Sequence, residues 1–198
     1  MRILAIDPGT TKSAYVVYEW SGHAIGSVFA HGIYNNEDML SVIATTPHDH
    51  LAIEMVASYG MAVGKTVFET CVWIGRFIQK DSQQWLNPPS DGWYTKIYRK
   101  DVKMHLCGSP RAKDANVRQA IIDMYPATGG GKTPQVGTKS KPGPLYGVSK
   151  DVWAALGVAI TYRDSYEAIT GEQDGEQSKL VKDIEQFPED LRIRERME

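Results

Sequence analysis

Three carboxylates occupy positions from which they could act together. Asp7 and Glu54 each end a short apolar run that is typical of a buried strand, and Asp151 stands just before an apolar stretch with helical spacing. Converging carboxylates repel one another unless a cation neutralises them, and hard oxygen ligands favour Mg²⁺ or Mn²⁺. Two such ions can activate a water and stabilise the leaving oxygen in phosphodiester hydrolysis. The sequence therefore predicts a magnesium site, in which Mn²⁺ would substitute.

Each of these acids also has a simpler interpretation. An aspartate before Pro-Gly, as at Asp7, is often a turn former. Asp151 is placed to offset the dipole of a helix in its first turn. Glu54 is harder to explain in this way, because a buried carboxylate at a strand end needs a partner. The joint placement of the three residues favours the functional interpretation.

The elements that must position these acids alternate between strands and helices. Two parallel strands ending in Asp7 and Glu54 would bring both carboxylates to the carboxyl edge of a sheet, where ligand sites of α/β proteins form. The element order predicts an α/β fold with a mixed five-stranded sheet and helices on both faces. The expected strands are 2–7, 13–20, 24–33, 51–54 and 93–98, and the expected helices are 37–46, 61–80, 99–106, 111–125 and 149–169.

The chain of 198 residues is long enough for one compact domain, which we expect over residues 1–170. Residues 171–198 are charged and poor in apolar types, so they are either a mobile tail or a helix that orders against something else. No apolar run reaches the roughly 20 residues that span a bilayer. We expect no signal peptide, and the widely spaced Cys71 and Cys107 indicate reduced thiols in a cytoplasmic protein.

Positive charge is concentrated in one segment. The formal net charge is -2, but residues 95–150 hold 11 of the 22 basic side chains and 3 of the 24 acidic ones. A local basic surface on a nearly neutral protein is typical of a protein that binds a phosphate backbone. The alternative is a solvated basic face without a partner.

Several segments resemble one known family. Residues 3–9 resemble the opening of RuvC-type Holliday junction resolvases, residues 52–54 their second acidic strand, and residues 155–161 their last helix. Between these, Lys103 and Lys113 flank a Gly-Ser pair, similar to the two substrate-binding lysines of the family. The motifs stand in the family's order over most of the chain.

The resemblance implies an RNase H-like fold, a homodimer and metal-dependent nicking of branched DNA. Asp7 would bridge two Mg²⁺ ions, with Glu54 and Asp151 each completing one shell, and Lys103 and Lys113 would act on the scissile phosphate. The broad apolar surface of helix 61–80 is the expected dimer contact. The further basic residues expected on the DNA backbone are Arg99, Lys100, Arg111, Arg118, Lys132, Lys139 and Lys141.

The chain departs from the family pattern in three places. The last helix of the family usually carries a second acid or histidine three residues after the first, and that position is Ala154 here. The family's aromatic wedge has its nearest counterpart in Tyr59. The loop 129–147 is longer than usual, which favours a bacteriophage-type variant with a DNA-gripping loop; the alternative is a flexible connector.

Other interpretations of the motifs are less consistent with the sequence. Residues 7–11 resemble the phosphate loop of the actin/Hsp70/sugar-kinase group, but those proteins need two lobes and this chain supplies one. Residues 129–133 resemble a Walker A loop, but Pro126 occupies a required glycine position. Residues 48–50, His-Asp-His, are interpreted as a polar turn. A DNA-structure binder without catalytic activity stays open, because Ala154 removes one expected acid.

Overall fold

The structure is a computed structural model of the chain. It describes all residues except 23, 59, 61, 86–91 and 186–198, and it describes side chains up to residue 168. The chain divides into two compact units, Met1–Tyr162 and Arg163–Glu198. Within the described part, no helix is both long enough and apolar enough to cross a membrane.

One sheet of five strands organises the first unit. The strand order is β3-β2-β1-β4-β5. β1 pairs antiparallel with β2 and parallel with β4, β2 pairs antiparallel with β3, and β4 pairs parallel with β5. This is the mixed sheet that the sequence predicted. The strands are β1 (Arg2–Asp7), β2 (Lys12–Glu19), β3 (Ser27–Asn35), β4 (His50–Met55) and β5 (Tyr94–Tyr98).

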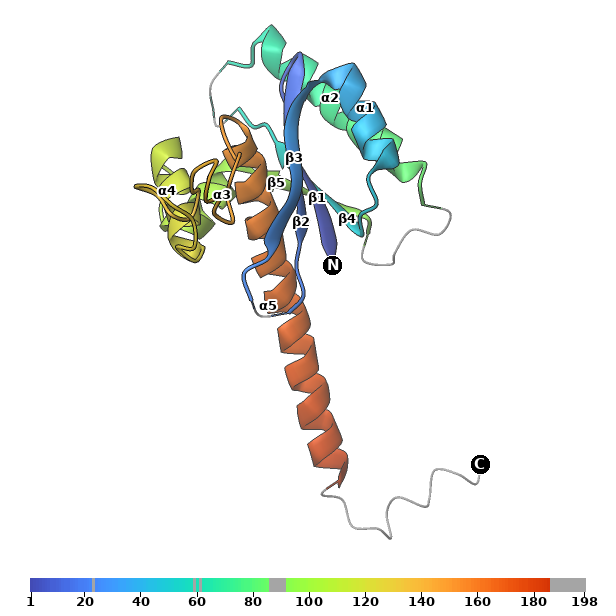
Figure 1. Cartoon of the computed structure of the whole chain (residues 1–198). Coiled ribbons are helices and arrows are strands. Elements are labelled where there is room, and N and C mark those ends of the chain that lie inside the picture. Colours follow the sequence, from blue (N-terminus) through green and yellow to red (C-terminus); the bar gives the residue numbers. More distant parts are fainter. Residues whose placement is uncertain (23, 59, 61, 86–91, 186–198) are drawn as a thin grey trace. The chain divides into compact units, whose positions relative to one another are not determined.

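Helices cover both faces of the sheet, as expected. In Figure 1, α1 and α2 lie on one face, and α3, α4 and the first turns of α5 lie on the other. The two groups follow from the chain order, since α1 and α2 flank β4 in sequence whereas the other three helices come after β5. The helices are α1 (Asn36–Thr45), α2 (Lys65–Ser82), α3 (Arg99–Cys107), α4 (Asp114–Met124) and α5 (Val152–Glu185).

Successive residues of β1 and β4 point to opposite faces of the sheet. Ile6 and Ile53 are fully buried in the core beneath α1 and α2. Asp7 and Glu54, the next residue on each strand, therefore face the side that carries α3, α4 and α5. The core on the α1–α2 side consists of Leu4, Ile6, Tyr15, Val17, Met39, Ile43, Leu51, Ile53, Ile74 and Phe77.

The fourth helix begins later than the sequence predicted. The expected start at residue 111 is wrong, because α4 starts at Asp114. Gly108 ends α3 in the left-handed conformation, with φ of 65°, which releases the chain into a turn before α4 begins. The shift makes Lys113 the residue that precedes the first turn of α4, and it places Asp114 inside that turn.

Two other helix limits also differ from the expected ones. The last helix was expected to end at residue 169, but α5 continues to Glu185. The helix expected over 61–80 starts at Lys65, since Gly64 before it has an extended backbone, with φ of -86° and ψ of 170°. Residues 171–198 were expected to form either a mobile tail or a helix. α5 includes residues 171–185, and residues 186–198 lie outside the described part of the chain.

The expected polar turn at residues 48–50 is wrong for its last residue. His50 begins β4 and is 5% exposed. Its ring stacks on Tyr162 with the centroids 4.1 Å apart, and its Nε2 lies 2.9 Å from Thr95 Oγ1. A histidine that satisfies its polar atoms in this way serves the packing between the sheet and α5.

Candidate functional site

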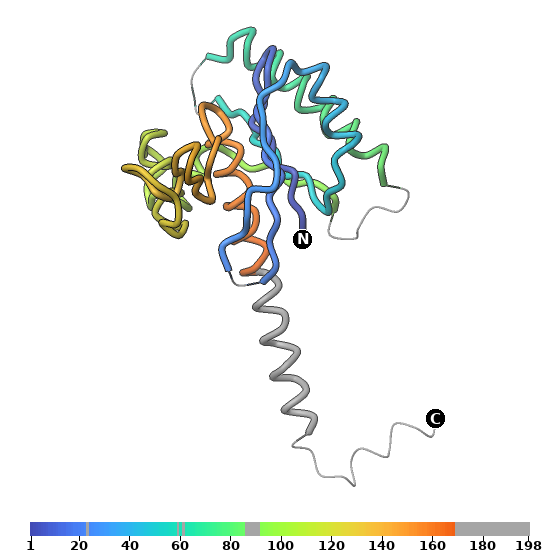
Figure 2. The backbone as a smooth tube through the Cα atoms, in the orientation of Figure 1, coloured from blue at the N-terminus to red at the C-terminus, as the bar shows by residue number. Residues whose placement is uncertain are grey.

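Asp7 and Glu54 lie next to each other at the carboxyl edge of the sheet. The parallel register pairs Ala5 with Ala52 and Ile6 with Ile53, and each carboxylate is the next residue on its strand. Figure 2 shows β1 and β4, which are far apart in sequence, side by side in the centre of the sheet. The placement that the sequence predicted for these two acids follows from this register.

Asp151 lies in the turn that leads into α5. Its carbonyl oxygen accepts hydrogen bonds from Ala154 N–H at 2.9 Å and Ala155 N–H at 3.2 Å, so it acts as the first acceptor of the helix. Lys150 before it has φ of 51°, the one left-handed non-glycine residue in the described part of the chain. Such conformations persist only where the surrounding structure enforces them, and they are frequent at functional sites.

A cleft of about 650 Å³ connects these acids with basic residues of α3 and α4. Its walls come from the ends of β1 and β4, from α3 and α4, and from the segment that enters α5. The elements therefore bring together residues that are up to about a hundred and forty positions apart in the chain. The charged residues that line it are Asp7, Glu54, Arg99, Asp114, Arg118, Lys150 and Asp151.

The charge around Asp7 is not balanced. Burial, followed by the negative charge of Glu54, raises the pKa of Asp7 from 3.8 to about 8. Arg99 acts in the opposite direction, whereas Asp151 and Asp114 add to the rise. A carboxyl group in this position takes up a proton or a cation at neutral pH, because the protein alone does not compensate its charge.

Glu54 is compensated in part. Burial raises its pKa, and the charge and hydrogen bond of Arg99 oppose that rise. Arg99 Nη1 donates a hydrogen bond to Glu54 Oε2 at 3.2 Å. Arg99 thus takes over part of the neutralisation that a metal ion would supply at this edge of the sheet.

The donor set fits a hard divalent cation by its chemistry. Asp7, Glu54 and Asp151 offer carboxylate oxygens on three separate elements, and Mg²⁺ binds such oxygens together with water. The acids are not a finished cage: among the described residues, no three histidine, cysteine, aspartate or glutamate side chains are grouped so that they could hold an ion. The raised pKa of Asp7 is the observation that favours a cation at this place.

The expected DNA-binding residues of α3 and α4 occupy two kinds of position. Arg99 and Lys103 lie beside the carboxylates, with side chains 26% and 21% exposed. Arg118 reaches the cleft with its guanidinium carbon 5.2 Å from the centre of the Trp153 ring. Lys100, Arg111 and Lys113 are exposed around the same helices.

The long loop before α5 is folded on itself instead of extending as a simple connector. Gly129 N–H donates to the Pro134 carbonyl oxygen at 2.8 Å, and Gly130 N–H to that of Lys141 at 2.9 Å. Figure 2 shows the loop doubled back next to the start of α5. Leu145 is fully buried and holds the loop to the domain. The loop lysines Lys132, Lys139 and Lys141 are all exposed.

Sequence reasoning missed two charged residues of the site, Asp114 and Lys150. Asp114 lines the cleft and pairs with Arg99 and Lys103, yet in the sequence it is only an acid near a helix start. Ala154 lines the cleft one turn after Asp151, so the position of the missing family acid faces the site without a carboxylate. Tyr59, the expected wedge, lies outside the described residues.

The loop after β1 also bears on the phosphate-loop interpretation of residues 7–11. Gly9 N–H donates to Ser13 Oγ at 3.2 Å, and Asn36 Nδ2 donates to the Gly9 carbonyl oxygen at 2.9 Å. Asn36 N–H donates to the Thr11 carbonyl oxygen at 3.0 Å. Because Gly9 N–H is engaged within the protein, it is not directed at a nucleotide phosphate.

Comparison with known proteins identifies the fold. No protein-family model matches the sequence, and no curated protein matches it. The structure is similar to that of Thermus thermophilus RuvC, with a TM-score of 0.59 at 16% identity over 86% of this chain and 97% of that one. It is also similar to T. thermophilus RuvC in complex with a Holliday junction substrate, with a TM-score of 0.57 at 16% identity over 86% and 96%. The chain therefore has the RNase H-like fold found in RuvC.

Proposed function

We propose that this protein is a metal-dependent endonuclease that cleaves branched DNA, with the four-way junction as its substrate. The observation that supports this most directly is the uncompensated Asp7 beside Glu54, in a cleft that Arg99, Arg118 and Lys150 also line. The fold similarity to RuvC, including RuvC in complex with a Holliday junction substrate, supports the same activity.

In the proposed mechanism, Asp7, Glu54 and Asp151 would hold the Mg²⁺ ions. Bound there, the ions would lower the pKa of a water and stabilise the leaving oxygen, so no histidine base is needed. Glu54, which pairs with Arg99 in the free protein, would then be a metal ligand. Lys103 and Lys113 hold the scissile phosphate in line with the carboxylates and offset the charge that develops on it.

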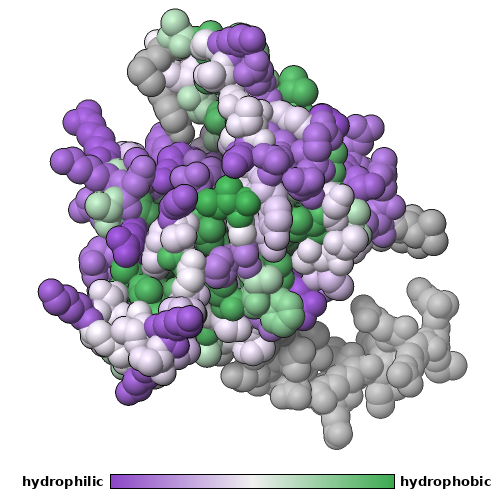
Figure 3. Space-filling model, turned by 45° about the horizontal axis from the view of Figure 1, so that its top comes forward, coloured by the Kyte–Doolittle hydropathy of each residue, from purple (hydrophilic) through white to green (hydrophobic). Residues whose placement is uncertain are grey.

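The flanking DNA backbone would follow the basic surface around the cleft. Lys100 and Arg118 extend it on α3 and α4, Arg111 extends it between these helices, and the loop lysines add exposed positive charge before α5 in the chain. In Figure 3, hydrophilic side chains project from the side of the molecule that carries α3 and α4. Binding through several phosphates makes affinity steeply dependent on salt. The role of Tyr59 as a wedge stays a prediction.

A homodimer formed through α2 is part of the proposal. Phe68 and Val72, one turn apart on this helix, are each 63% exposed, which is unusual for large apolar side chains on a solvated helix. A two-fold dimer would present two active sites to two strands of a junction, and the symmetry of protein and substrate would match. Sedimentation of wild type and Phe68→Glu tests this, with a monomer expected for the variant only.

We place the activity in the cytoplasm of a bacterium or of a phage-infected host. Both cysteines, Cys71 and Cys107, are free thiols, which agrees with a reducing compartment.

The test is cleavage of a labelled four-way junction and a matched linear duplex, with Mg²⁺ or with EDTA. Paired nicks are expected in the junction only, with Mg²⁺ or Mn²⁺ only, and none with Asp7→Asn. Asp123→Asn is the matched control, because Asp123 is an exposed acid at the far end of α4 whose Oδ1 accepts a hydrogen bond from Gln119 at 2.8 Å. Equal cleavage by wild type and Asp7→Asn would contradict the proposal.

A second candidate is a DNA-structure binder that does not cleave. Ala154 favours it, since the site has no carboxylate at that position, as does the lack of a grouped set of ligands among the described residues. Tight junction binding without cleavage in Mg²⁺, Mn²⁺ or Ca²⁺ would decide for this candidate. Ala154→Asp, which adds the acid, would then be expected to create metal-dependent cleavage.

A further inference from the structure

One oxygen of Asp114 is held by two cations of α3. Asp114 Oδ1 lies 2.9 Å from Arg99 Nη2 and 3.2 Å from Lys103 Nζ. The Asp114 side chain is 70% exposed, whereas those of Arg99 and Lys103 are 26% and 21% exposed. A solvent-facing anion therefore covers two cations that are largely buried beside the catalytic carboxylates.

The other side of Arg99 faces the interior of the site. Its Nη1 donates to Glu54 Oε2, so the guanidinium joins an inner carboxylate to an outer one. An exposed ion pair contributes little to stability. The stability of α4 does not require the contact of Asp114 with Arg99 and Lys103 either, because an acid in the first turn offsets the helix dipole wherever in that turn it lies.

The contacts of Asp114 are those that a phosphate oxygen would make. Arginine and lysine together bind phosphate by charge-assisted hydrogen bonds to its outer oxygens. Arg99 and Asp114 line the cleft that holds Asp7 and Glu54, and Lys103 Nζ lies 3.2 Å from Asp114 Oδ1. An anion in the position of the Asp114 carboxylate is thus next to the carboxylates and open to solvent.

We propose that Asp114 occupies a phosphate subsite in the free protein, and that a backbone phosphate of DNA displaces it from Arg99 and Lys103. The inference rests on the proposed function and deepens it, because it names the cations that receive a phosphate and the residue that competes for them. Asp114 is a positioning residue: it holds Arg99 and Lys103 in place before DNA arrives, and it lowers the affinity for DNA because it must first be released.

The experiment measures junction binding in EDTA, so that neither metal nor cleavage enters the result. Asp114→Asn keeps the shape of the side chain and removes its charge. It is expected to bind the junction about three- to tenfold more tightly than wild type, the range that corresponds to losing one or two exposed ion pairs. Asp123→Asn makes the same change of net charge on the same helix and is expected to bind like wild type.

A double-mutant cycle identifies the cations involved. In a Lys103→Ala background, Asp114→Asn is expected to raise affinity by a smaller factor than in wild type, because one of the two competed cations is gone. The urea midpoint of each variant tests whether the protein folds. Because Asp114 is exposed, its substitution is expected to leave the fold intact.

The outcomes separate this inference from the proposed function. If wild type binds the junction and Asp114→Asn binds no more tightly than Asp123→Asn, the subsite assignment is overturned and the proposed function stands. If Asp114→Asn loses Mg²⁺-dependent cleavage without any gain of affinity in EDTA, Asp114 is a metal ligand and the assignment is again overturned. If wild type does not bind the junction at all, both proposals fail.

Discussion

The two ends of the central strands carry similar clefts that differ in how their charges are arranged. The cleft at the amino end of β1 has a volume of about 700 Å³, and the one at the carboxyl end about 650 Å³. At the amino end, Arg2 pairs with Glu19, and Arg2 N–H donates to Asp49. At the carboxyl end, Asp7 and Glu54 share a single arginine.

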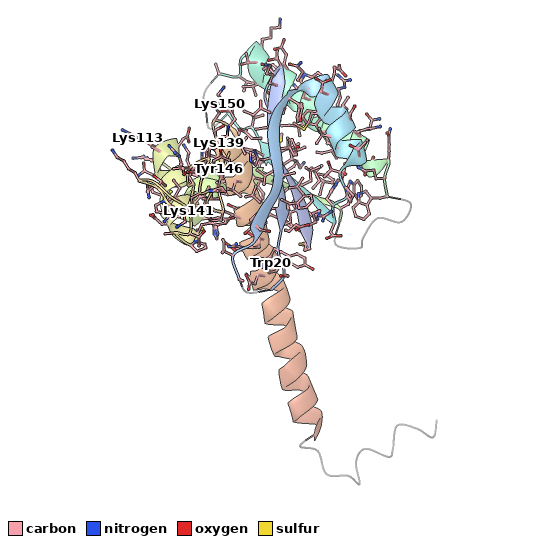
Figure 4. All side chains as sticks on the ribbon, viewed as in Figure 1. Trp20, Lys113, Lys139, Lys141, Tyr146 and Lys150 are labelled. Atoms are coloured by element: carbon pink, nitrogen blue, oxygen red, sulfur yellow. The ribbon has the colours of Figure 1, made fainter. Side chains whose placement is uncertain are left out.

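The two ends differ in whether the charge of a buried or partly buried acid is compensated by the residues around it. His48 and Asp81 near the amino end are almost fully buried and pair with each other at 2.8 Å. Asp7 is only partly buried, but the groups around it leave its charge uncompensated. In Figure 4, Trp20 lies below Lys113, Lys139, Lys141 and Lys150 in the view. Uncompensated charge inside a cleft therefore indicates a function better than the volume of the cleft does.

The largest effect is expected when one glutamate is substituted at each end of the central strands and the two variants are compared. Glu54→Gln should reduce junction cleavage by about a thousandfold or more, because a ligand and a negative charge are lost where a cation must bind. Glu19→Gln at the other end should leave cleavage within about twofold, since its side chain is 37% exposed and pairs with Arg2. Single-turnover experiments measure the cleavage rates of the two variants. Similar rates would contradict the distinction between the two ends.

The buried pair near the amino end should affect stability instead. Asp81→Ala leaves His48 buried without its partner and should lower the free energy of unfolding by about 3–5 kcal/mol. Asp49→Ala, at an exposed acid nearby, should change it by less than about 1 kcal/mol. Urea unfolding followed by fluorescence measures both. A loss of cleavage rate per folded molecule in Asp81→Ala would show that this end also serves catalysis.

Lys103 connects the two proposals and should show an intermediate effect. Lys103→Ala is expected to reduce the rate of cleavage by about a hundredfold, because it removes a cation close to the reacting phosphate. Junction affinity in EDTA should fall by about threefold only, since Arg99 and the surrounding basic residues remain. Lys100→Ala, on the exposed side of the same helix, is the comparison. As a residue proposed to contact the DNA backbone alone, it should lower junction affinity and leave the rate of cleavage largely unchanged. Equal losses of rate and affinity would remove the catalytic role of Lys103.

The smallest effect concerns pH. Asp7 ordinarily loses its proton near pH 3.8, but in the folded protein its pKa is about 8. Between these values the folded state binds more protons than the unfolded state, so stability without metal falls as pH rises. The raised pKa of Glu54 acts in the same direction. The urea midpoint in EDTA should therefore be lower at pH 8 than at pH 5.

Asp7→Asn should reduce that fall and be more stable than wild type at pH 8 by about 1–3 kcal/mol. Mg²⁺ should stabilise wild type at pH 8 and leave the variant unchanged, because ions that bind only the folded state stabilise it. Parallel pH curves for the two proteins would show that Asp7 is not the group responsible.

The sequence predicted those parts of the molecule that local pattern determines. Short apolar runs identified the strands, and their last residues located Asp7 and Glu54. The expected order of strands and helices agrees with the structure because each segment has a clear period and clear turn residues. Asp151 was found since it precedes a strongly apolar helix.

The rest depended on contacts between distant residues. Arg99 was expected on the DNA backbone, and nothing in the sequence indicated that it also pairs with Glu54, 45 positions earlier in the chain. Asp114 was not predicted because nothing in the sequence brings it to Arg99 and Lys103. The sequence placed His50 in a turn. Nothing in it indicated that the His50 ring stacks on Tyr162, which lies far later in the chain. Local pattern carries no information about such pairs.

The glycines of the loop before α5 limit how the sequences of related proteins can change. A Cβ atom would lie 2.4 Å from the Pro134 carbonyl oxygen at Gly129, 2.2 Å from Gly143 N at Gly137, and 2.3 Å from the Pro134 carbonyl oxygen at Gly143. Neutral drift can move or replace the exposed lysines, but it cannot place a side chain at these glycines without rebuilding the loop. Their spacing, combined with Asp7 and Glu54, would therefore be a better query for finding remote homologues in genomes than overall identity.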